Sequence, residues 1–559
     1  MRRERPPRII AQIESFLTFY PKRKASCRQN SFAFIYSQRR THASIVFVET
    51  IMLFRAGVKL TRCCFFSAAN YHQNATTRRT LPTKWMTRRK HVVVLPGRSV
   101  SCSASSSEAE KAQNDVTMSK PQEVWKASID FKSIRENQSH VETNCLNRNV
   151  TNVSVQFVVS QYEAFVALDQ KADLLRASRN ENAKKMKGKM EKVIRDELIE
   201  EGKRIKDELA LIEVELNDIS DALQREAQKI PNDTHPDVPI GGEEFATVME
   251  VVGTQRDFGT MKCRDHVTIG ETLNMFDFET ASRVSGTRFV YLTGVGAMLE
   301  LALINWAMQK AISKGFEPMV VPDLVRKSVV EKCGFQPRAE NTQVYSVENS
   351  DLCLAGTAEL LLGGKCMDQT YEEKDLPKKF VAFSHCFRTE AGAAGAATRG
   401  MYRLHQFSKV EMFAVSTPEA SNAMHEELSN IEKEMYAELG LHFKVLDMSS
   451  HDLGAPAYRK FDIEAWMPAL ERYGEISSAS NCTDFQARRL NIKYRPNAVD
   501  GKKQPLQFAH TLNATACAVP RMIICILENF QNEDGSVTVP EALRPFLGGM
   551  EVFRNPAAI

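Results

Sequence analysis

Acidic residues are scarce in the first hundred positions of this 559-residue chain, which hold 20 Lys and Arg side chains but only Glu4, Glu14 and Glu49 as acids. The formal net charge of +4 therefore hides a remainder with 53 basic and 66 acidic side chains. A basic, acid-poor start that also contains Ser and Thr is typical of an organelle-targeting presequence. Residues 52–62 have this amphipathic character most clearly, and Met52 is an alternative candidate start. The competing interpretation is a disordered basic arm that binds nucleic acid.

Cysteine motifs and long apolar runs are also missing. The thirteen cysteines are scattered without CxxC or His/Cys spacing, which argues against a structural zinc site and against a disulfide framework. No uninterrupted span of about 18 apolar residues indicates a membrane helix, so we expect no membrane anchoring. With 43% hydrophobic and 25% charged residues, the chain has the composition of a globular protein of two or three domains.

Heptad spacing appears from Gln161 onward and predicts two long helices. One apolar seam contains Phe165, Leu168, Ala172 and Leu175 and continues to Met186, and a sharper one contains Leu198, Gly202, Ile205, Leu209, Ile212, Leu216, Ile219 and Leu223. Two such helices joined near 187–192 predict an antiparallel coiled-coil hairpin. Pro231 ends the second helix because proline cannot continue it. Residues 232–239 then form a stiff connector and a plausible domain boundary.

Basic side chains crowd the distal half of this hairpin, where backbone phosphates of a nucleic acid are the obvious target. The alternative for a charged heptad pattern is dimerisation or a solvated spacer. The residues predicted to contact RNA are Lys184, Lys185, Lys189, Lys203 and Arg204. The predicted organisation is a leader and disordered linker at 1–118, an arm-bearing domain at 119–237 and a second domain at 238–559.

A helix with an apolar face is predicted from Gly296 to Lys314, with Gly315 as a suitable C-terminal cap. The following segment, 316–322, predicts a strand interrupted by prolines, and therefore an edge strand or an interface element. Whether this pair belongs to the core or to a subunit contact stays open at this point.

The stretch from Phe387 to Glu411 predicts an antiparallel hairpin with one half-buried face, because two alternating segments flank a Gly/Ala-rich loop. Arg388 suits bidentate capture of a phosphate or a carboxylate. Phe407 is a candidate for stacking on a base. Alone, the Arg388 and Glu390 pair is more typical of a surface ion pair.

Three further segments, 354–359, 474–486 and 510–521, complete an ordered set. In this order and spacing the chain resembles seryl-tRNA synthetases of class II from about Gln161 to Leu547. Residues 298–322 look like class motif 1, 387–411 like motif 2, and 512–521 like motif 3. The segments 357–359 and 475–478, with the long hairpin, point to serine within the class. The segments 230–239, 458–468 and 513–521 look most like the animal mitochondrial branch, in agreement with the leader.

The resemblance implies an α+β fold, with a mainly antiparallel β-sheet flanked by helices and an N-terminal coiled-coil arm. It implies an enzyme of the mitochondrial matrix that activates L-serine with ATP and Mg²⁺ and transfers it to tRNA(Ser). It also implies a homodimer formed through motif 1, including Pro322, with tRNA bound across the subunits.

The resemblance assigns site residues by position. Thr357 and Glu359 would hold the serine ammonium, Arg388 would lie near its carboxylate, and Glu411 and Thr515 would bond its hydroxyl. The serine-binding set is Thr357, Ala358, Glu359, Arg388, Glu411, Asn513 and Thr515. The ATP-binding set is Arg388, Thr389, Glu390, Leu404, Phe407, Glu475, Ile476, Ser477, Ser478 and Arg521, with adenine between Phe407 and Arg521. Mg²⁺ would be ligated by Glu475 and Ser478, and the catalytic set is Arg388, Glu475 and Arg521.

Several alternatives stay open. Thr515 is also a candidate strand-to-helix cap, and Asn513 a candidate backbone support. Motif 3 departs from the class pattern, with Ala514, Ala516 and Ala518 where glycines are usual and Pro520 before the arginine. The Ala/Gly-rich loop 390–399 favours backbone-mediated contacts to the tRNA acceptor end. The rival functions are a non-catalytic RNA-binding protein and an enzyme that passes activated serine to a carrier protein.

Overall fold

The computed structural model describes residues 125–336, 343–390 and 400–555. The predicted leader and linker of residues 1–118, with Met52, and most of the Gly/Ala-rich loop lie outside these ranges. Within them, no helix is both long enough and apolar enough to cross a membrane.

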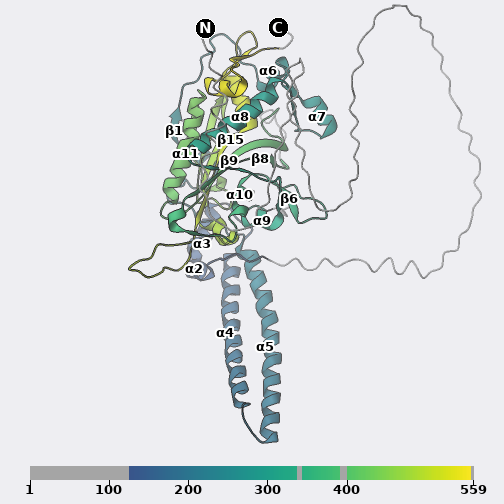
Figure 1. The fold of residues 1–559 in the computed structure, drawn as a ribbon, viewed down its shortest axis with the longest axis vertical. Coiled ribbons are helices and arrows are strands. Elements are labelled where there is room, and N and C mark those ends of the chain that lie inside the picture. The colour runs from purple at the N-terminus through teal and green to yellow at the C-terminus, as the bar shows by residue number, and fades with distance from the viewer. Residues whose placement is uncertain (1–124, 337–342, 391–399, 556–559) are drawn as a thin grey trace, which may run out of the picture. The chain divides into compact units, whose positions relative to one another are not determined.

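A helical region opens the described chain and ends in a long hairpin (Figure 1). Its helices are α2 (Phe131–Glu136), α3 (Gln138–Asn147), α4 (Val155–Lys185) and α5 (Lys192–Ala227). Helix α4 begins earlier than the heptads indicate, because the Ser154 side chain caps it by accepting a hydrogen bond from the Phe157 N–H. The predicted hairpin is confirmed, and its tip lies at 186–191.

The seam of the hairpin matches most of the heptad prediction. Ile205, Leu209, Ile212 and Leu216 on α5 are buried, and Ala172 on α4 packs against this cluster. The prediction that Met186 continues the first seam is wrong, since α4 ends at Lys185 and Met186 is 37% exposed. The last inward contact of α4 is instead polar: Asn182 is buried and donates to the Leu198 carbonyl at 3.1 Å.

An eight-stranded sheet forms the centre of the larger part of the chain, in the order β1-β10-β11-β12-β15-β9-β8-β4. Neighbouring strands are antiparallel, except that β4 runs parallel to β8. The predicted α+β architecture with a mainly antiparallel sheet is therefore confirmed. In sheet order the strands are β1 (Thr247–Val252), β10 (Phe443–Asp447), β11 (Arg459–Met467), β12 (Arg472–Asn481), β15 (His510–Ala518), β9 (Gln406–Ser416), β8 (Lys378–Phe387) and β4 (Glu317–Val320).

Helices α8 (Val295–Ser313), α11 (Ser421–Glu438) and α13 (Val519–Asn529) pack on this sheet. Trp306, Tyr436 and Ile526 are among the fully buried side chains of the shared core. Each fully buried large apolar side chain contributes roughly 1.5–3 kcal/mol to the stability of the fold. This core therefore stabilises the four strands in the middle of the sheet, β11, β12, β15 and β9. Helix α8 and edge strand β4 match the predicted pair, and Gly315 after α8 has a positive φ of 87°.

The predicted hairpin of residues 387–411 is present as β8 and β9, with Phe387 paired to Gln406 and Ala382 to Glu411. The expectation of one half-buried face is wrong for β9, whose residues from Ser408 onward are all buried. The reason is its position between β8 and β15, where helices cover it as well.

Shorter elements surround this core. The helices are α6 (His266–Thr272), α7 (Phe278–Val284), α9 (Lys327–Lys332), α10 (Glu359–Lys365) and α12 (Phe485–Leu490). The short strands pair as β2 (Phe276–Asp277) with β3 (Tyr291–Leu292), β5 (Leu324–Arg326) with β6 (Leu352–Leu354), β13 (Lys493–Arg495) with β7 (Thr370–Glu372) and β14 (Gln507–Phe508), and β16 (Val537–Thr538) with β17 (Val552–Phe553). The 3₁₀ helices are η2 (Glu243–Phe245), η3 (Glu373–Asp375), η5 (Ser450–Asp452) and η6 (Glu541–Leu547).

Candidate active site

Two adjoining cavities lie on the central strands. Cavity A is lined by Arg388, Glu390, Leu404, Phe407, Glu475, Ile476, Ser477, Ser478, Thr515 and Arg521, together with Met401, Tyr402, Arg403, Lys409, Ala518 and Pro520. Cavity B, of about 480 Å³, includes Thr357, Glu359, Arg388, Glu411, Ser478 and Asn513 in its lining. The structure thus brings most of the predicted site residues together. Arg388, Lys409 and Ser478 line both cavities, so the cavities meet at these side chains.

Arg521 occupies the first turn of α13, directly after Pro520. Proline is well suited to this position because its missing N–H has no partner in a helix start, which accounts for the proline before the arginine. The Arg521 Nη1 donates to the Glu475 carbonyl at 2.8 Å and to its Oε2 at 2.9 Å. Burial alone would raise the pKa of Glu475, but the charges of Arg521, Lys460 and Arg388 lower it below its ordinary value. Glu475 is therefore an ionised carboxylate.

Aromatic rings lie beneath both arginines of cavity A. The Arg388 guanidinium lies 5.3 Å from the centre of the Phe407 ring, and the Arg521 guanidinium lies 5.0 Å from that of Tyr402. Sequence reasoning placed Phe407 opposite Arg521 and gave Tyr402 no role. Tyr402 follows directly after the loop outside the described residues, where no alternation pattern singles it out.

The remaining motif 2 residues have distinct positions. Glu390 pairs with Arg403 at 3.1 Å and has a positive φ of 46°. The Thr389 N–H donates to the Gln343 carbonyl at 3.1 Å, so its backbone joins the hairpin to a neighbouring segment. Thr389 is outside both cavity linings, as is Ala358, which is fully buried at the start of α10.

Cavity B has two buried carboxylates. The Glu359 Oε1 accepts a hydrogen bond from the Gln486 Nε2 at 2.6 Å. Burial, reinforced by the negative charge of Glu411, raises the pKa of Glu359 to about 7. The Thr357 hydroxyl accepts from the Glu359 N–H at 3.3 Å. Gln486 lies at the end of the segment 474–486, but sequence reasoning assigned no role to it, because only the fold brings α12 to the start of α10.

Two neighbouring side chains contact the Glu411 carboxylate. It pairs with Thr515 across β9 and β15, and the Thr515 hydroxyl donates to its Oε2 at 3.2 Å. The Lys409 ammonium forms an ion pair with the same carboxylate. Lys409, which sequence reasoning missed, is the single ammonium facing Glu359 and Glu411 in the described lining of cavity B. Arg388 also lines cavity B, so two buried carboxylates and two cationic side chains face it, and the cavity offers partners to both a cationic and an anionic ligand group.

A bulge in β15 sets the direction of Thr515. The register shifts between Thr515 and Cys517, which makes Ala516 the extra residue. The Tyr436 hydroxyl donates to the carbonyls of Thr515 and Ala516, at 3.0 and 3.2 Å. The cap of α13 is Ala518, so the alternative role of Thr515 as a helix cap is wrong.

Ser477 supports the same bulge from β12. Its hydroxyl lies 2.6 Å from the Thr515 carbonyl and 2.7 Å from the Glu432 Oε1. Burial raises the pKa of Glu432 well above its ordinary value, so a protonated Glu432 can donate to Ser477 while Ser477 donates to Thr515. Ser477 is 2% exposed, and Asn513, beside Ser480 on β12, donates to the Cys482 Sγ at 3.7 Å.

The two predicted metal ligands, Glu475 and Ser478, both line cavity A and both offer oxygen donors. The described part of the chain contains no group of three or more His, Cys, Asp or Glu side chains arranged to hold a metal ion. One carboxylate and one hydroxyl suit Mg²⁺, which takes few protein ligands and fills its shell with water and phosphate oxygens.

The predicted RNA-contacting residues are exposed around the tip of the α4 and α5 hairpin. Lys185 pairs with Glu181 at 3.4 Å and Arg204 with Glu201 at 2.7 Å, each within its own helix. Pro322 is exposed just after β4. Nearby apolar side chains are exposed as well, with Leu301 on α8 at 61% and Val320 at 100%.

Comparisons with known proteins agree in pointing to one family. Residues 129–234 match the seryl-tRNA synthetase N-terminal domain, and residues 343–530 match the tRNA synthetase class II core domain (G, H, P, S and T). The serine–tRNA ligase of Rubrobacter xylanophilus is 45% identical over 421 residues, which cover 75% of this chain and 98% of the relative. The mitochondrial serine–tRNA ligase of Mus musculus is 48% identical over 352 residues, covering 62% and 67%. The structure of seryl-tRNA synthetase from Pyrococcus horikoshii complexed with ATP aligns with a TM-score of 0.71 and 35% identity, covering 76% of this chain and 99% of that one.

Proposed function

The chain belongs to the seryl-tRNA synthetase family and is a serine–tRNA ligase, and we propose that cavities A and B are its ATP and serine sites. The observation that carries this proposal is the position of Arg388, which lines both cavities. A serine carboxylate in cavity B and an ATP α-phosphate in cavity A would meet at this guanidinium. The family's structural relative from Pyrococcus horikoshii is complexed with ATP, which supports ATP as the nucleotide.

The serine would be held by charge and by hydroxyl recognition. Its ammonium would lie against Glu359 and Thr357 and its hydroxyl against Glu411 and Thr515, with Asn513 in the cavity wall. Ala358 is buried outside the lining and would act only by joining Thr357 to Glu359. A site that presents buried hydrogen-bonding groups to a hydroxyl rejects the analogue without it, because those groups are left unpaired. Glycine and alanine would therefore be poor substrates.

The ATP would be oriented by the remaining side chains of cavity A. Phe407 and Leu404 offer apolar surface for adenine, and Glu390 offers a polar group beside it. Ile476 is fully buried in the lining, whereas Thr389, outside it, would act through its backbone hydrogen bond to Gln343. Mg²⁺, held by Glu475 and Ser478, would supply charge neutralisation to the phosphates. Ser477 would act indirectly, because its hydroxyl bonds the Thr515 carbonyl on the neighbouring strand β15.

The chemistry needs no protein nucleophile. The serine carboxylate attacks the α-phosphorus, pyrophosphate leaves, and a terminal ribose hydroxyl of tRNA(Ser) then takes the seryl group from the adenylate. Arg388 and Arg521 stabilise the charge that develops on the α-phosphate, and the two cavities fix the reactants in line. Glu475 orients Arg521 through the two hydrogen bonds described above.

Substituting Arg388 tests this arrangement. In Arg388→Ala, we expect serine-dependent ATP–pyrophosphate exchange to fall by at least about a hundredfold, because charge stabilisation at the transition state is lost. The matched control is Arg326→Ala, which removes an exposed arginine paired with Asp351. Exchange that stays at the control level would refute the assignment of Arg388.

We also propose a homodimer formed through α8, β4 and Pro322, with the arm of one subunit reaching tRNA held at the other subunit's site. Exposed apolar side chains on α8 and β4 support this interface, and basic residues on the hairpin support phosphate contacts. The proposed domains are 119–237 for tRNA binding and 238–559 for catalysis. Loop 390–399 would meet the acceptor end.

The proposed location is the mitochondrial matrix. The basic, acid-poor first hundred residues support it, as does the similarity to the mitochondrial enzyme of the mouse, although bacterial relatives are about as similar. Residues 52–110 placed ahead of a fluorescent protein should direct it to mitochondria in cultured animal cells. A fusion that stays in the cytosol would overturn this location.

A further inference from the structure

One wall of cavity B is a turn held from outside the catalytic region. Residues 454–457 join η5 to β11, and all four line cavity B together with Thr357 and Glu359. A turn has no strand or helix partners of its own, so its backbone carbonyls must find donors elsewhere.

The helical region supplies those donors. Arg148, the C-cap residue directly after α3, donates to the carbonyls of Gly454 and, at 3.0 Å, Ala457. Asn232, in the connector after α5, donates from its backbone N–H to the Ala455 carbonyl at 2.9 Å and from its Nδ2 to the Pro456 carbonyl at 2.9 Å. Two residues outside the catalytic region therefore satisfy four consecutive carbonyls of the wall.

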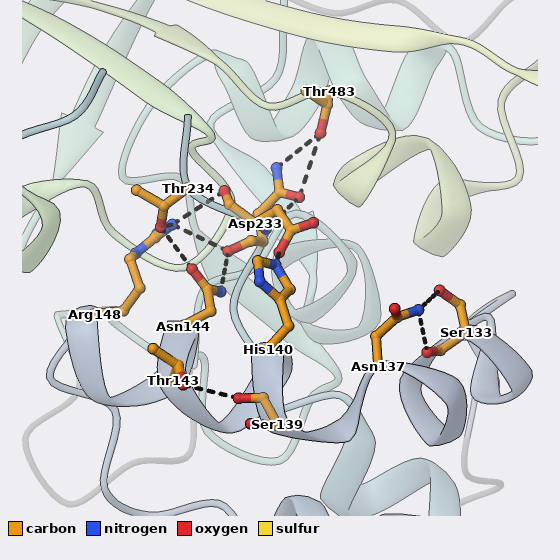
Figure 2. Close-up of polar contacts among 11 residues, drawn as sticks. Ser133, Asn137, Ser139, His140, Thr143, Asn144, Arg148, Asp233, Thr234 and Thr483 are labelled. Carbon is orange, nitrogen blue, oxygen red and sulfur yellow. Dashed lines mark hydrogen bonds and ion pairs between the residues drawn. The ribbon is translucent and has the colours of Figure 1, made fainter. Parts of the chain in front are cut away.

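Both anchors are themselves fixed. Arg148 is 5% exposed, and its Nη1 also donates to the Asn232 carbonyl at 3.1 Å. The Asn144 side chain donates to that carbonyl at 3.0 Å and accepts from Thr234 at 2.7 Å. Figure 2 shows Arg148, Asn144 and Thr234 converging on this junction, while Asn137 and Ser133 bond to each other farther along the helices. Hydrogen bonds therefore connect Arg148, Asn144, Asn232 and Thr234 into one network.

Asn232 also reaches a second part of the same cavity. Its Nδ2 lies 2.9 Å from the Cys482 carbonyl and 2.9 Å from the Thr483 hydroxyl. Cys482 lines cavity B, at the end of the strand that carries Glu475 and Ser478. One side chain therefore joins two walls of the cavity to the connector.

We propose that Arg148 and Asn232 are positioning residues for serine: the helical region shapes the serine pocket through the 454–457 turn, even without tRNA. The inference rests on the proposed position of serine in cavity B. A guanidinium that donates to carbonyls of the turn holds it at a set distance from Glu359, and its loss frees carbonyls that must then turn toward water. Cavity A does not include the turn among its described lining residues, so ATP should be insensitive.

The test uses the full chain in serine-dependent ATP–pyrophosphate exchange without tRNA, with serine and ATP varied separately. In Arg148→Met, which keeps an unbranched stem about as long as that of arginine up to Nε but removes the donors, we expect the KM for serine to rise about tenfold while the KM for ATP stays within twofold. Asn232→Asp keeps the shape, removes the Nδ2 donations and should give the same split if Arg148→Met does not fold. Asn137→Ala, in the same helical region, is the control and should leave both constants unchanged.

Glu359→Gln separates the two ways of failing. If that variant leaves the KM for serine unchanged, the proposed position of serine is wrong. If it raises the KM for serine but Arg148→Met and Asn232→Asp do not, or if they raise both constants equally, the positioning role is overturned.

Discussion

At the scale of single residues, the serine site is defined by a buried carboxylate. Burial, reinforced by the negative charge of Glu411, raises the pKa of Glu359 to about 7, although Lys409 and Arg388 both line the cavity and lower it. A serine ammonium beside Glu359 would favour its ionised form, because an opposite charge stabilises the carboxylate.

The raised pKa of Glu359 predicts a pH dependence. The carboxyl is protonated below about pH 7 and ionised above it, and only the ionised form attracts the serine ammonium. We expect kcat/KM for serine in the exchange reaction to fall as the pH drops below 7, by up to about tenfold per unit. In Glu359→Gln, kcat/KM should be low and lack this step. A profile flat down to pH 5.5 in the wild type would contradict the assignment.

Residue identities were predictable only where a motif carried them. Arg388, Glu411, Glu475 and Arg521 are motif positions with a role that the resemblance assigns, whereas Lys409 and Gln486 lie in the same segments, 387–411 and 474–486, without one. Lys409 lies two residues before Glu411 on a strand, which places both side chains on one face, but an alternating lysine is also typical of a solvated strand. Only the burial of β9 from Ser408 onward makes this lysine part of the site.

At the scale of elements, periodicity predicted the long helices well and the sheet poorly. The heptads of 198–223 fixed α5 because adjacent turns of one helix repeat the pattern many times. The bulge at Ala516 has no comparable repeating pattern in the sequence, since it depends on hydrogen bonds from Tyr436 and Ser477, which belong to other elements. The contacts of Arg148 are equally hidden, because they join residues about 300 positions apart.

The arm should act on tRNA and not on serine activation. We expect replacement of Lys184, Lys185, Lys189, Lys203 and Arg204 by Gln to leave ATP–pyrophosphate exchange unchanged and to raise the KM for tRNA(Ser) about tenfold or more. The salt dependence of tRNA binding should become shallower, because fewer counterions are released. Replacing the exposed Lys502 and Lys503 by Gln is the control. Equal loss of exchange and charging would refute a separate role for the arm.

At the scale of the whole molecule, the exposed apolar side chains of α8 and β4 set the expected assembly. Leu301 and Val320 are 61% and 100% exposed, and β4 is the last strand of the sheet in the described part of the chain. Edge strands with apolar side chains tend to pair with another chain, and here the proposed partner is a second copy.

Charged substitutions on this face should separate the subunits. We expect Leu301→Glu combined with Val320→Glu to shift the protein from dimer to monomer in sedimentation velocity at micromolar concentration, since each buried carboxylate would lack a partner. Leu211→Glu, at a 74% exposed position on the arm, is the matched control and should leave the mass unchanged. A wild-type protein that sediments as a monomer would contradict the dimer.

The site as a whole makes one prediction that needs no variant. Purified full-length protein supplied with Mg²⁺, ATP and radiolabelled pyrophosphate should form labelled ATP when serine is added. Alanine should support exchange at least about a hundredfold less well, because it has no hydroxyl to bond Glu411 and Thr515. The absence of serine-dependent exchange, or equal exchange with alanine, would contradict the proposal that cavities A and B bring the serine carboxylate and the ATP α-phosphate together at Arg388.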